Sequence, residues 1–239
     1  MHQLIYSFIQ DRDRNGIGNT VPLLDRFLTY LDSKLSRESC QEAEFETRKR
    51  SDCPLWYELR YGRLTGSKLH ESLRCKTSEG SLLDLILEAT KISDTFYMAR
   101  GRNSESEVLS EVGKIHKITI KKVGFLLIPS WPIVGASLDQ ISDEFIVECP
   151  AKTEFVEKCV EKGEIISKFK AQMMLQMLAA GEKEGLFCVA DVDFERNKKV
   201  NIIELAYDED LINAIIAEAV AFWEEDIFPP LYQAALSTC

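Results

Sequence analysis

The amino-acid sequence predicts a mixed α/β domain, in which a central mixed sheet is flanked by helices. The first observation is a change of period near residue 117: apolar residues recur at helical spacing before it, and short β-branched and aromatic runs follow it. The second observation is the order of the later segments, because three strand-like runs precede a long helix, two more strands and a closing helix. Sheets covered by helices are the usual result of such an order.

The composition excludes some classes of protein. Hydrophobic residues make up 45% and charged residues 28% of the 239 residues, as in ordinary globular proteins. No apolar run approaches the ~20 residues of a membrane span, and residues 1–16 lack the features of a secretory signal, so no membrane partner is expected. The net charge of −10 argues against broad nonspecific coating of nucleic acid, but a metal-dependent nucleic-acid enzyme needs only a local basic rim.

The cysteines and histidines show no pattern of ligands or disulfides. The seven cysteines are scattered and form no CxxC pair, which supports neither a zinc knuckle nor a disulfide framework. His70 and His116 have no His or Cys neighbour at ligand spacing, so structural or surface roles are expected for them. Reduced thiols, and with them an intracellular location, nuclear or cytoplasmic, are predicted.

Residues 1–45 are predicted to be a partly helical N-terminal extension, and residues 46–235 the main domain. Residues 1–20 mix charges with two glycines and predict a loosely structured lead-in. Residues 21–35 carry leucines and one phenylalanine at helical spacing and predict a helix. Further helices are expected over residues 56–61, from Ser67 as a favourable N-cap, over residues 81–90 and over residues 101–116.

The second half of the chain predicts the sheet. The runs ITIKKVGFLLI, WPIVGASLDQI and EFIVECP, all within residues 118–150, are separated by turn residues and indicate antiparallel strands. Residues 164–181 predict a long helix that stops at Gly181. GLFCVADVDFE and KKVNIIELAY predict two more strands joined at ERNK, and a closing helix is expected to end before Pro229.

Carboxylates gather near the three-strand segment. Asp139 follows the second strand and Glu148 ends the third, while Glu105 lies in the helix before them. Opposite residues of a hairpin lie roughly 5 Å apart, so the first two acids can meet. Carboxylate oxygens suit Mg²⁺ or Mn²⁺. Acids at strand ends are also common as solvated turn residues, and spacing alone leaves that alternative open.

Five motifs in order suggest a family. They are WYELRYGRLTGS (Trp56 to Ser67), Gly101 with Glu105, GASLD ending at Asp139, the strand carrying Glu148, and the glutamine pair Gln172 and Gln176 in KFKAQMMLQML. With them the chain resembles the YqaJ-type viral recombinase domains, the group that includes lambda exonuclease, within the PD-(D/E)XK nucleases. The resemblance covers residues 47–231, and it implies a restriction-endonuclease-like core with a central mixed sheet.

The resemblance also implies an activity and a site. It implies a Mg²⁺- or Mn²⁺-dependent deoxyribonuclease that hydrolyses phosphodiester bonds, acting 5′-to-3′ on linear DNA ends. Glu105, Asp139 and Glu148 correspond to the metal ligands of the family, and Gln172 to an assisting glutamine. A lysine two residues after the strand glutamate acts on the attacking water in this family.

The chain departs from the family pattern at that lysine. The family reads E-x-K-C-P, whereas this chain reads IVECP over residues 146–150. Alignment on the apolar strand places Glu148 on the metal-binding glutamate and leaves Lys152 as the nearest replacement lysine, although Pro150 is expected to bend the strand. The alternative is a catalytically weakened or dead nuclease-fold protein that binds DNA or a protein partner.

The first motif is predicted to bind a DNA end. Arg60 and Arg63, the hydroxyls of Thr65 and Ser67, and the start of the next helix form a plausible phosphate-binding corner. By resemblance this corner receives a 5′-phosphate of duplex DNA. Trp56 of the same motif is expected to be a core or rim aromatic residue more than a base-stacking platform.

The remaining expectations concern basic runs and assembly. Basic residues cluster at residues 48–50, 121–122 and 196–199, and such runs are usually solvated faces, although one can line a DNA groove. Some relatives act as oligomers, so a homo-oligomer is one possible state of this chain.

Overall fold

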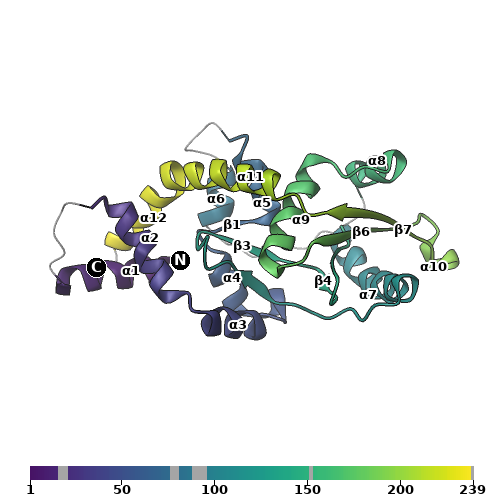
Figure 1. Ribbon diagram of the computed structural model, residues 1–239, viewed down its shortest axis with the longest axis horizontal. Coiled ribbons are helices and arrows are strands. Elements are labelled where there is room, and N and C mark those ends of the chain that lie inside the picture. Colours follow the sequence, from purple (N-terminus) through teal and green to yellow (C-terminus); the bar gives the residue numbers. More distant parts are fainter. Residues whose placement is uncertain (16–20, 76–80, 88–95, 151–152, 238–239) are drawn as a thin grey trace.

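The structure, a computed structural model, describes residues 1–15, 21–75, 81–87, 96–150 and 153–237 (Figure 1). The helices are α1 (His2–Asn15), α2 (Leu23–Lys34), α3 (Arg37–Glu46), α4 (Pro54–Arg60), α5 (Gly66–Ser72), α6 (Ser81–Leu87), α7 (Phe96–His116), α8 (Glu154–Lys162), α9 (Ser167–Ala180), α10 (Phe194–Asn197), α11 (Glu209–Phe222) and α12 (Phe228–Leu236). A 3₁₀ turn, η1 (Arg50–Asp52), precedes α4, and a π-helical turn, η2 (Trp223–Ile227), joins α11 to α12.

The strands form two mixed sheets, which agrees with the predicted fold class. They are β1 (Leu64–Thr65), β2 (Phe125–Leu127), β3 (Val134–Ser137), β4 (Gln140–Ile141), β5 (Phe145–Glu148), β6 (Glu184–Ala190) and β7 (Val200–Ala206). The first sheet has the order β1-β3-β2 and the second β4-β5-β6-β7. The chain passes from one sheet to the other between β3 and β4, so this turn lies where the two sheets meet.

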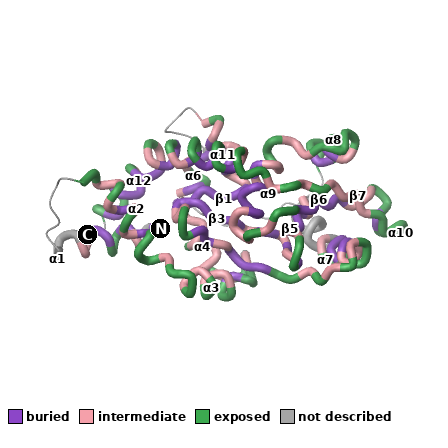
Figure 2. The backbone as a smooth tube through the Cα atoms, viewed as in Figure 1, coloured by how far each residue is buried: buried purple, intermediate pink, exposed green. Residues whose placement is uncertain are grey.

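Both predicted types of strand pairing are present. The pairs β2–β3, β4–β5 and β6–β7 are antiparallel, whereas β1–β3 and β5–β6 are parallel. The first predicted strand is shorter than expected, because β2 covers only Phe125–Leu127, and Lys121 makes an isolated bridge to Ile141. The central strands β5 and β6 are buried on both faces, as expected for strands with neighbours on each side (Figure 2).

Helix α9 connects the two sheets. It contacts β2 and β3 of the first sheet and β5 and β6 of the second. Its buried residues include three methionines and one glutamine, so the helix is enclosed by protein over most of its circumference. It ends at Gly181, which adopts a left-handed conformation with φ 76°, as the sequence predicted.

The N-terminal helices belong to the main hydrophobic core. The prediction of a loosely structured lead-in over residues 1–20 is wrong for its described part, because α1 is a helix that buries Ile5, Phe8 and Ile9. Helix α1 contacts both α2 and α12, and Figure 1 shows these three helices together at one end of the molecule. The proposed boundary between residues 45 and 46 stays a prediction.

The C-terminal helices differ from the prediction. The helical segment does not end before Pro229; a new helix, α12, begins at Phe228 and has proline in its first turn. Proline fits there because the first N–H groups of a helix have no partner within the helix. The π-helical turn brings Trp223 inward, where its Nε1 donates to the carbonyl of Gly62 at 2.8 Å.

Two smaller differences concern helix starts. The helix expected from Ser67 begins at Gly66, with Thr65 as an N-cap that makes no side-chain cap bond. Helix α8 was not predicted, although Thr153 caps it through Val156 N–H and Gly163 ends it in a left-handed conformation. Residues 88–90 of one predicted helix lie outside the described residues.

No helix in the part of the chain that the structure describes combines the length and apolar character needed to cross a bilayer.

Replacing Phe27 by alanine tests whether α2 is part of the folding unit. Phe27 is fully buried between Phe8, Trp223 and Phe228, with ring centroids 5.3 to 6.4 Å apart. We expect Phe27→Ala to lower the free energy of unfolding by about 3–5 kcal/mol, measured by denaturant titration. The control Phe45→Ala removes a ring that is 62% exposed and should change it by less than about 0.5 kcal/mol. Equal effects of the two variants would contradict this assignment.

Candidate active site

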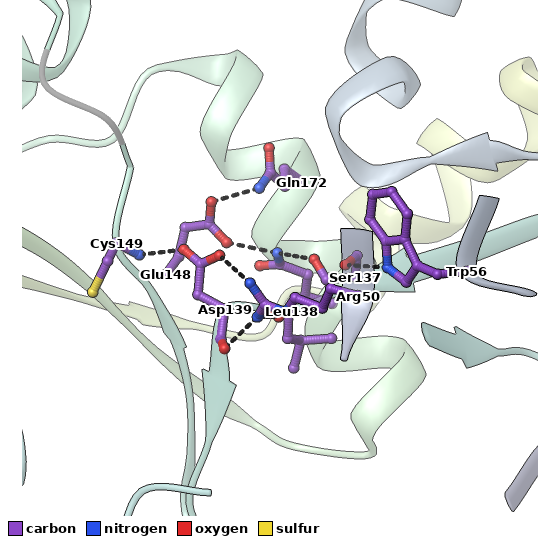
Figure 3. Close-up of polar contacts among 9 residues, drawn as sticks. Arg50, Trp56, Ser137, Leu138, Asp139, Glu148, Cys149 and Gln172 are labelled. Carbon is purple, nitrogen blue, oxygen red and sulfur yellow. Dashed lines mark hydrogen bonds and ion pairs between the residues drawn. The ribbon is translucent and has the colours of Figure 1, made fainter. Parts of the chain in front are cut away.

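The β4–β5 hairpin brings Asp139 and Glu148 together. Gln140 pairs with Val147 in the ladder, so the next pair outward, Asp139 and Glu148, continues the same register. The backbone N–H of Cys149 donates to Asp139 Oδ2 at 2.8 Å, which holds the turn before β4 against the end of β5 (Figure 3). The prediction that the hairpin places these two acids side by side is therefore confirmed.

The carboxylate of Glu148 is held by two glutamines of α9. Gln172 Nε2 donates to Glu148 Oε1 at 2.6 Å, and Gln176 Nε2 donates to Glu148 Oε2 at 2.7 Å. Gln176 also donates to the carbonyl of Ser137 at 3.2 Å, so it ties β3 to β5. Residues four apart lie on one face of a helix, which explains why both amides reach the same carboxylate. The sequence analysis named only Gln172 as a site residue. The spacing of four residues between Gln172 and Gln176, which places both on one face of the helix, also pointed to Gln176.

Burial makes the acid pair hard to ionise. Glu148 is 6% exposed, and burial, followed by the negative charge of Asp139, raises the pKa of its carboxyl well above the usual range. Burial also raises the pKa of Asp139, although Arg50 and the Cys149 N–H oppose that change. The two acids titrate as a pair, and the pair binds a proton more readily than isolated carboxylates do.

A cation of the protein already lies beside this pair. Arg50 Nη1 lies 3.4 Å from Asp139 Oδ1, and Arg50 Nη2 donates to the carbonyls of Leu138 and Asp139 (Figure 3). The expectation that the basic run 48–50 is a solvated face is therefore wrong for Arg50, whereas Arg48 forms a surface pair with Glu44. The sequence carried no signal for this contact, because Arg50 and Asp139 are 89 residues apart.

The Trp56 motif lies beside the same turn. Trp56 Nε1 donates to Ser137 Oγ at 3.4 Å, and the guanidinium of Arg60 stacks 4.3 Å from the centre of the Trp56 ring. Trp56 is thus a rim residue between β3 and Arg60, as the sequence predicted. Burial lowers the pKa of Arg60 to about 10, so the group stays protonated at neutral pH.

Two residues of the predicted phosphate corner are part of the core, which corrects the prediction. Arg63 is only 2% exposed, and its Nε and Nη1 donate to the carbonyls of Pro132 at 3.0 Å and Leu59 at 2.7 Å. It therefore ties the end of α4 to the loop before β3, and burial lowers its pKa to about 10. Thr65 is also buried. Arg60 and Ser67 remain partly exposed and are the members of the corner that an external phosphate can reach.

The remaining predicted members of the catalytic cluster are Lys152 and Glu105. Lys152 lies outside the described residues. Glu105 is a partly buried residue of α7 with contacts of its own. Across the described ranges, no three His, Cys, Asp or Glu side chains form a group that could hold a metal ion. The structure thus brings together two of the three predicted metal-binding carboxylates.

The two carboxylates nevertheless suit a divalent cation. Their oxygens, with no nitrogen or thiolate donor required, match the preference of Mg²⁺ and Mn²⁺. The raised pKa of each acid means that added positive charge would stabilise the pair. In addition, Gln176 Oε1 is buried and has no hydrogen-bond partner among the described groups, which leaves one further neutral oxygen next to Glu148.

The fold is similar to those of solved exonucleases. The alkaline exonuclease LHK-Exo from Laribacter hongkongensis superposes with a TM-score of 0.63 at 22% identity, over 77% of this chain and 98% of that chain. The Shutoff and Exonuclease Protein from Kaposi's sarcoma-associated herpesvirus gives a TM-score of 0.55 at 11% identity, over 98% of this chain and 83% of that chain. A phage-related exonuclease from Haemophilus somnus 129PT gives 0.52 at 13% identity, over 76% and 98%.

The fold that carries this acid pair is shared with these solved exonucleases. The chain belongs to the viral alkaline exonuclease family, whose sequence profile matches residues 3–173. The resemblance to YqaJ-type and lambda exonuclease-like proteins, drawn from the motifs, is thereby confirmed. The protein is therefore a member of a family of nucleases of the exonuclease class, which act on nucleic acid. A comparison with curated proteins finds no match.

Replacing Glu148 by glutamine tests the effect of burial on its pKa. A raised folded-state pKa means that the folded protein binds the proton more tightly than the unfolded chain, so stability falls as pH rises above the unfolded value of 4.5 towards the raised value. We expect the free energy of unfolding of the metal-free protein to fall over this range, and Glu148→Gln to flatten the decline. Denaturant titrations in chelator, from pH 5 upwards, measure both slopes.

The control for this measurement is Glu218→Gln, which removes an exposed carboxylate on α11. Its slope should match that of the parent protein. Parallel slopes for the parent and the Glu148 variant would show that the site does not penalise ionisation of Glu148.

Proposed function

We propose that the chain is a Mg²⁺- or Mn²⁺-dependent deoxyribonuclease that hydrolyses phosphodiester bonds, acting 5′-to-3′ from linear DNA ends. The observation that carries this proposal is the Asp139–Glu148 pair in a chain of the viral alkaline exonuclease family: Glu148 is buried and held by two amides of α9, and half-buried Asp139 lies beside it. A buried acid beside a second acid costs stability without a function for its charge, which favours a catalytic explanation.

Each residue of the pair has a definite role in this proposal. Asp139 and Glu148 would hold the metal, and Glu105 of α7 is the proposed third ligand. A bound Mg²⁺ or Mn²⁺ supplies an activated water and offsets negative charge on the phosphoryl group. Gln172 and Gln176 each donate to one oxygen of Glu148, which fixes the orientation of its carboxylate.

The proposed substrate contact is the Trp56–Arg60 motif. Arg60 keeps its charge and lies over the ring of Trp56. Trp56 in turn donates to Ser137, which is two residues before Asp139. A guanidinium presents donors that match two phosphate oxygens, so Arg60 with Ser67 would receive the 5′-phosphate of a duplex end. Solved complexes of the herpesvirus protein SOX with DNA and with RNA support nucleic acid as the ligand.

Three further parts of the proposal concern the missing lysine, the setting and the assembly. Lys152 is the proposed replacement for the motif lysine, because position 150, two residues after Glu148, is proline. No disulfide joins the described cysteines, and an intracellular setting, nuclear or cytoplasmic, is proposed on that basis. A homo-oligomer is proposed as one possible state of the enzyme.

Acid-to-amide variants test the nuclease proposal. With 5′-phosphorylated linear duplex and Mg²⁺ or Mn²⁺, we expect Asp139→Asn and Glu148→Gln to abolish measurable release of nucleotides. Gln172→Ala, which frees one oxygen of Glu148, should lower the rate about 10–100-fold. Glu218→Gln is the matched control on the surface and should retain the parent rate.

The same assay separates the proposal from its alternative. Complete inactivity of the parent with both metals, combined with intact DNA binding, would overturn the enzyme assignment and support a catalytically dead relative that binds DNA. Lys152→Ala should lower the rate at least about tenfold if this lysine acts on the water. Full activity of that variant would remove Lys152 from the site and leave the nuclease assignment intact.

Replacing Arg60 tests the contact with the DNA end. The parent should degrade a 5′-phosphorylated duplex faster than one with a 5′-hydroxyl, and Arg60→Ala should reduce this preference about tenfold because the phosphate loses a charged donor. Arg196→Ala, which removes an exposed arginine on α10, should leave the preference unchanged. A preference that survives Arg60→Ala would place the end-binding group elsewhere.

A further inference from the structure

The contacts of Arg50 differ in kind from the other contacts of the acid pair. Three of the four carboxylate oxygens accept hydrogen bonds from neutral amide N–H groups: Asp139 Oδ2 from the Cys149 backbone, and both oxygens of Glu148 from the two α9 glutamines. The fourth oxygen, Asp139 Oδ1, faces the Arg50 guanidinium at 3.4 Å. Within the described ranges, Arg50 is therefore the basic residue that forms an ion pair with these two acids.

Contacts between the end of α3 and the start of β2 fix the chain just before Arg50. Thr47, three residues earlier, is buried, and its Oγ1 accepts from the backbone N–H of Phe125 at 2.7 Å. Glu44 Oε1 accepts from the N–H of Gly124 at 2.8 Å, so the end of α3 is fastened to the start of β2. Any side chain at residue 124 would collide with the carbonyl of Glu44, only 1.9 Å from an added Cβ. The turn after α3 thus starts from a fixed point.

The backbone of Arg50 is unusual for a residue with a side chain. Its φ is 51°, in the left-handed region that glycine normally occupies. The conformation directs the guanidinium to the carbonyls of Leu138 and Asp139 as well as to the Asp139 carboxylate. One guanidinium thus contacts three acceptors of the turn at Leu138 and Asp139. Such an arrangement is expected of a residue that positions that turn.

The Arg50 guanidinium and a divalent cation would compete for the negative charge of Asp139. Asp139 Oδ1 is the carboxylate oxygen that neutral donors leave open, so it is the oxygen through which a metal can approach. A fixed positive charge at 3.4 Å from this oxygen repels a second cation and reduces the attraction that the two acids exert on it. The side chain of Arg50 is 28% exposed, which leaves it room to turn outward.

We propose that Arg50 is a positioning residue of the acid pair: it holds Asp139 and balances its charge in the metal-free protein, and a divalent cation must displace it to bind. The proposal rests on the metal-dependent function proposed above. It adds that the affinity for the metal depends on the exchange of the Arg50 guanidinium for the metal ion, as well as on the two carboxylates.

Mn²⁺ binding to the full chain tests this exchange without reference to activity. In metal-stripped protein, Arg50→Gln keeps an amide donor but removes the charge, and the dissociation constant for Mn²⁺, measured by calorimetry, should fall at least about tenfold. Arg50→Lys keeps the charge, so its dissociation constant should stay within about threefold of the parent value. Arg48→Gln makes the same change of charge two residues earlier, on the surface pair with Glu44, and should also stay near the parent value.

The outcomes separate this proposal from the function on which it rests. Equal or weaker binding by Arg50→Gln would overturn the role of Arg50, while Mn²⁺ binding that is lost in Asp139→Asn would still support the metal site. Absence of binding in both the parent and Arg50→Gln would overturn the metal site itself, and the exchange with it.

A folding defect in Arg50→Gln is also informative. If the variant unfolds without metal and Mn²⁺ restores its thermal transition, one cation replaces the other, as proposed. If it stays unfolded with and without Mn²⁺, the hydrogen bonds to the two carbonyls are what matter, and the exchange is excluded.

Discussion

The pairing of β4 with β5 is the constraint on which the site depends. The ladder sets Gln140 opposite Val147, and the next pair outward is Asp139 and Glu148. A slip by one residue would turn the Glu148 side chain to the opposite face of β5, away from the two α9 glutamines that donate to its carboxylate. These contacts and the Cys149–Asp139 hydrogen bond therefore require this register, and the register sets the two acids opposite each other.

The buried carboxylate of Glu148 is stable beside half-buried Asp139 because hydrogen-bond donors reach both of its oxygens. Helix α9 touches both sheets and supplies two amide donors four residues apart, on the face that meets β3 and β5. The other buried residues of that helix are apolar and pack in the core. One element therefore carries out two tasks: it joins the sheets, and it orients the carboxylate whose charge the fold has removed from water.

The N-terminal segment also contributes residues to the site. Helices α1 and α2 add aromatic and aliphatic side chains to the main core, and α3 is fastened to β2 through Thr47 and Glu44. The chain that leaves α3 then places Arg50 at Asp139 and Trp56 at Ser137, on the two sides of one turn. The segment between these residues links the proposed phosphate-binding motif to the acid pair.

The sequence by itself determined the features that depend on near neighbours. The long helix that stops at Gly181, the strands β5 and β6 on either side of it and the meeting of Asp139 with Glu148 follow from local periodicity and from a short hairpin. The motifs that indicate the family are also short stretches of sequence. The tertiary structure decided the rest: the contact of Arg50 with Asp139 spans 89 residues, and the hydrogen bond of Arg63 to the carbonyl of Pro132 spans 69. Such contacts have no signature in a sequence, because a side chain's exposure and charge partners are set by which distant elements pack against it, and packing follows from the whole core.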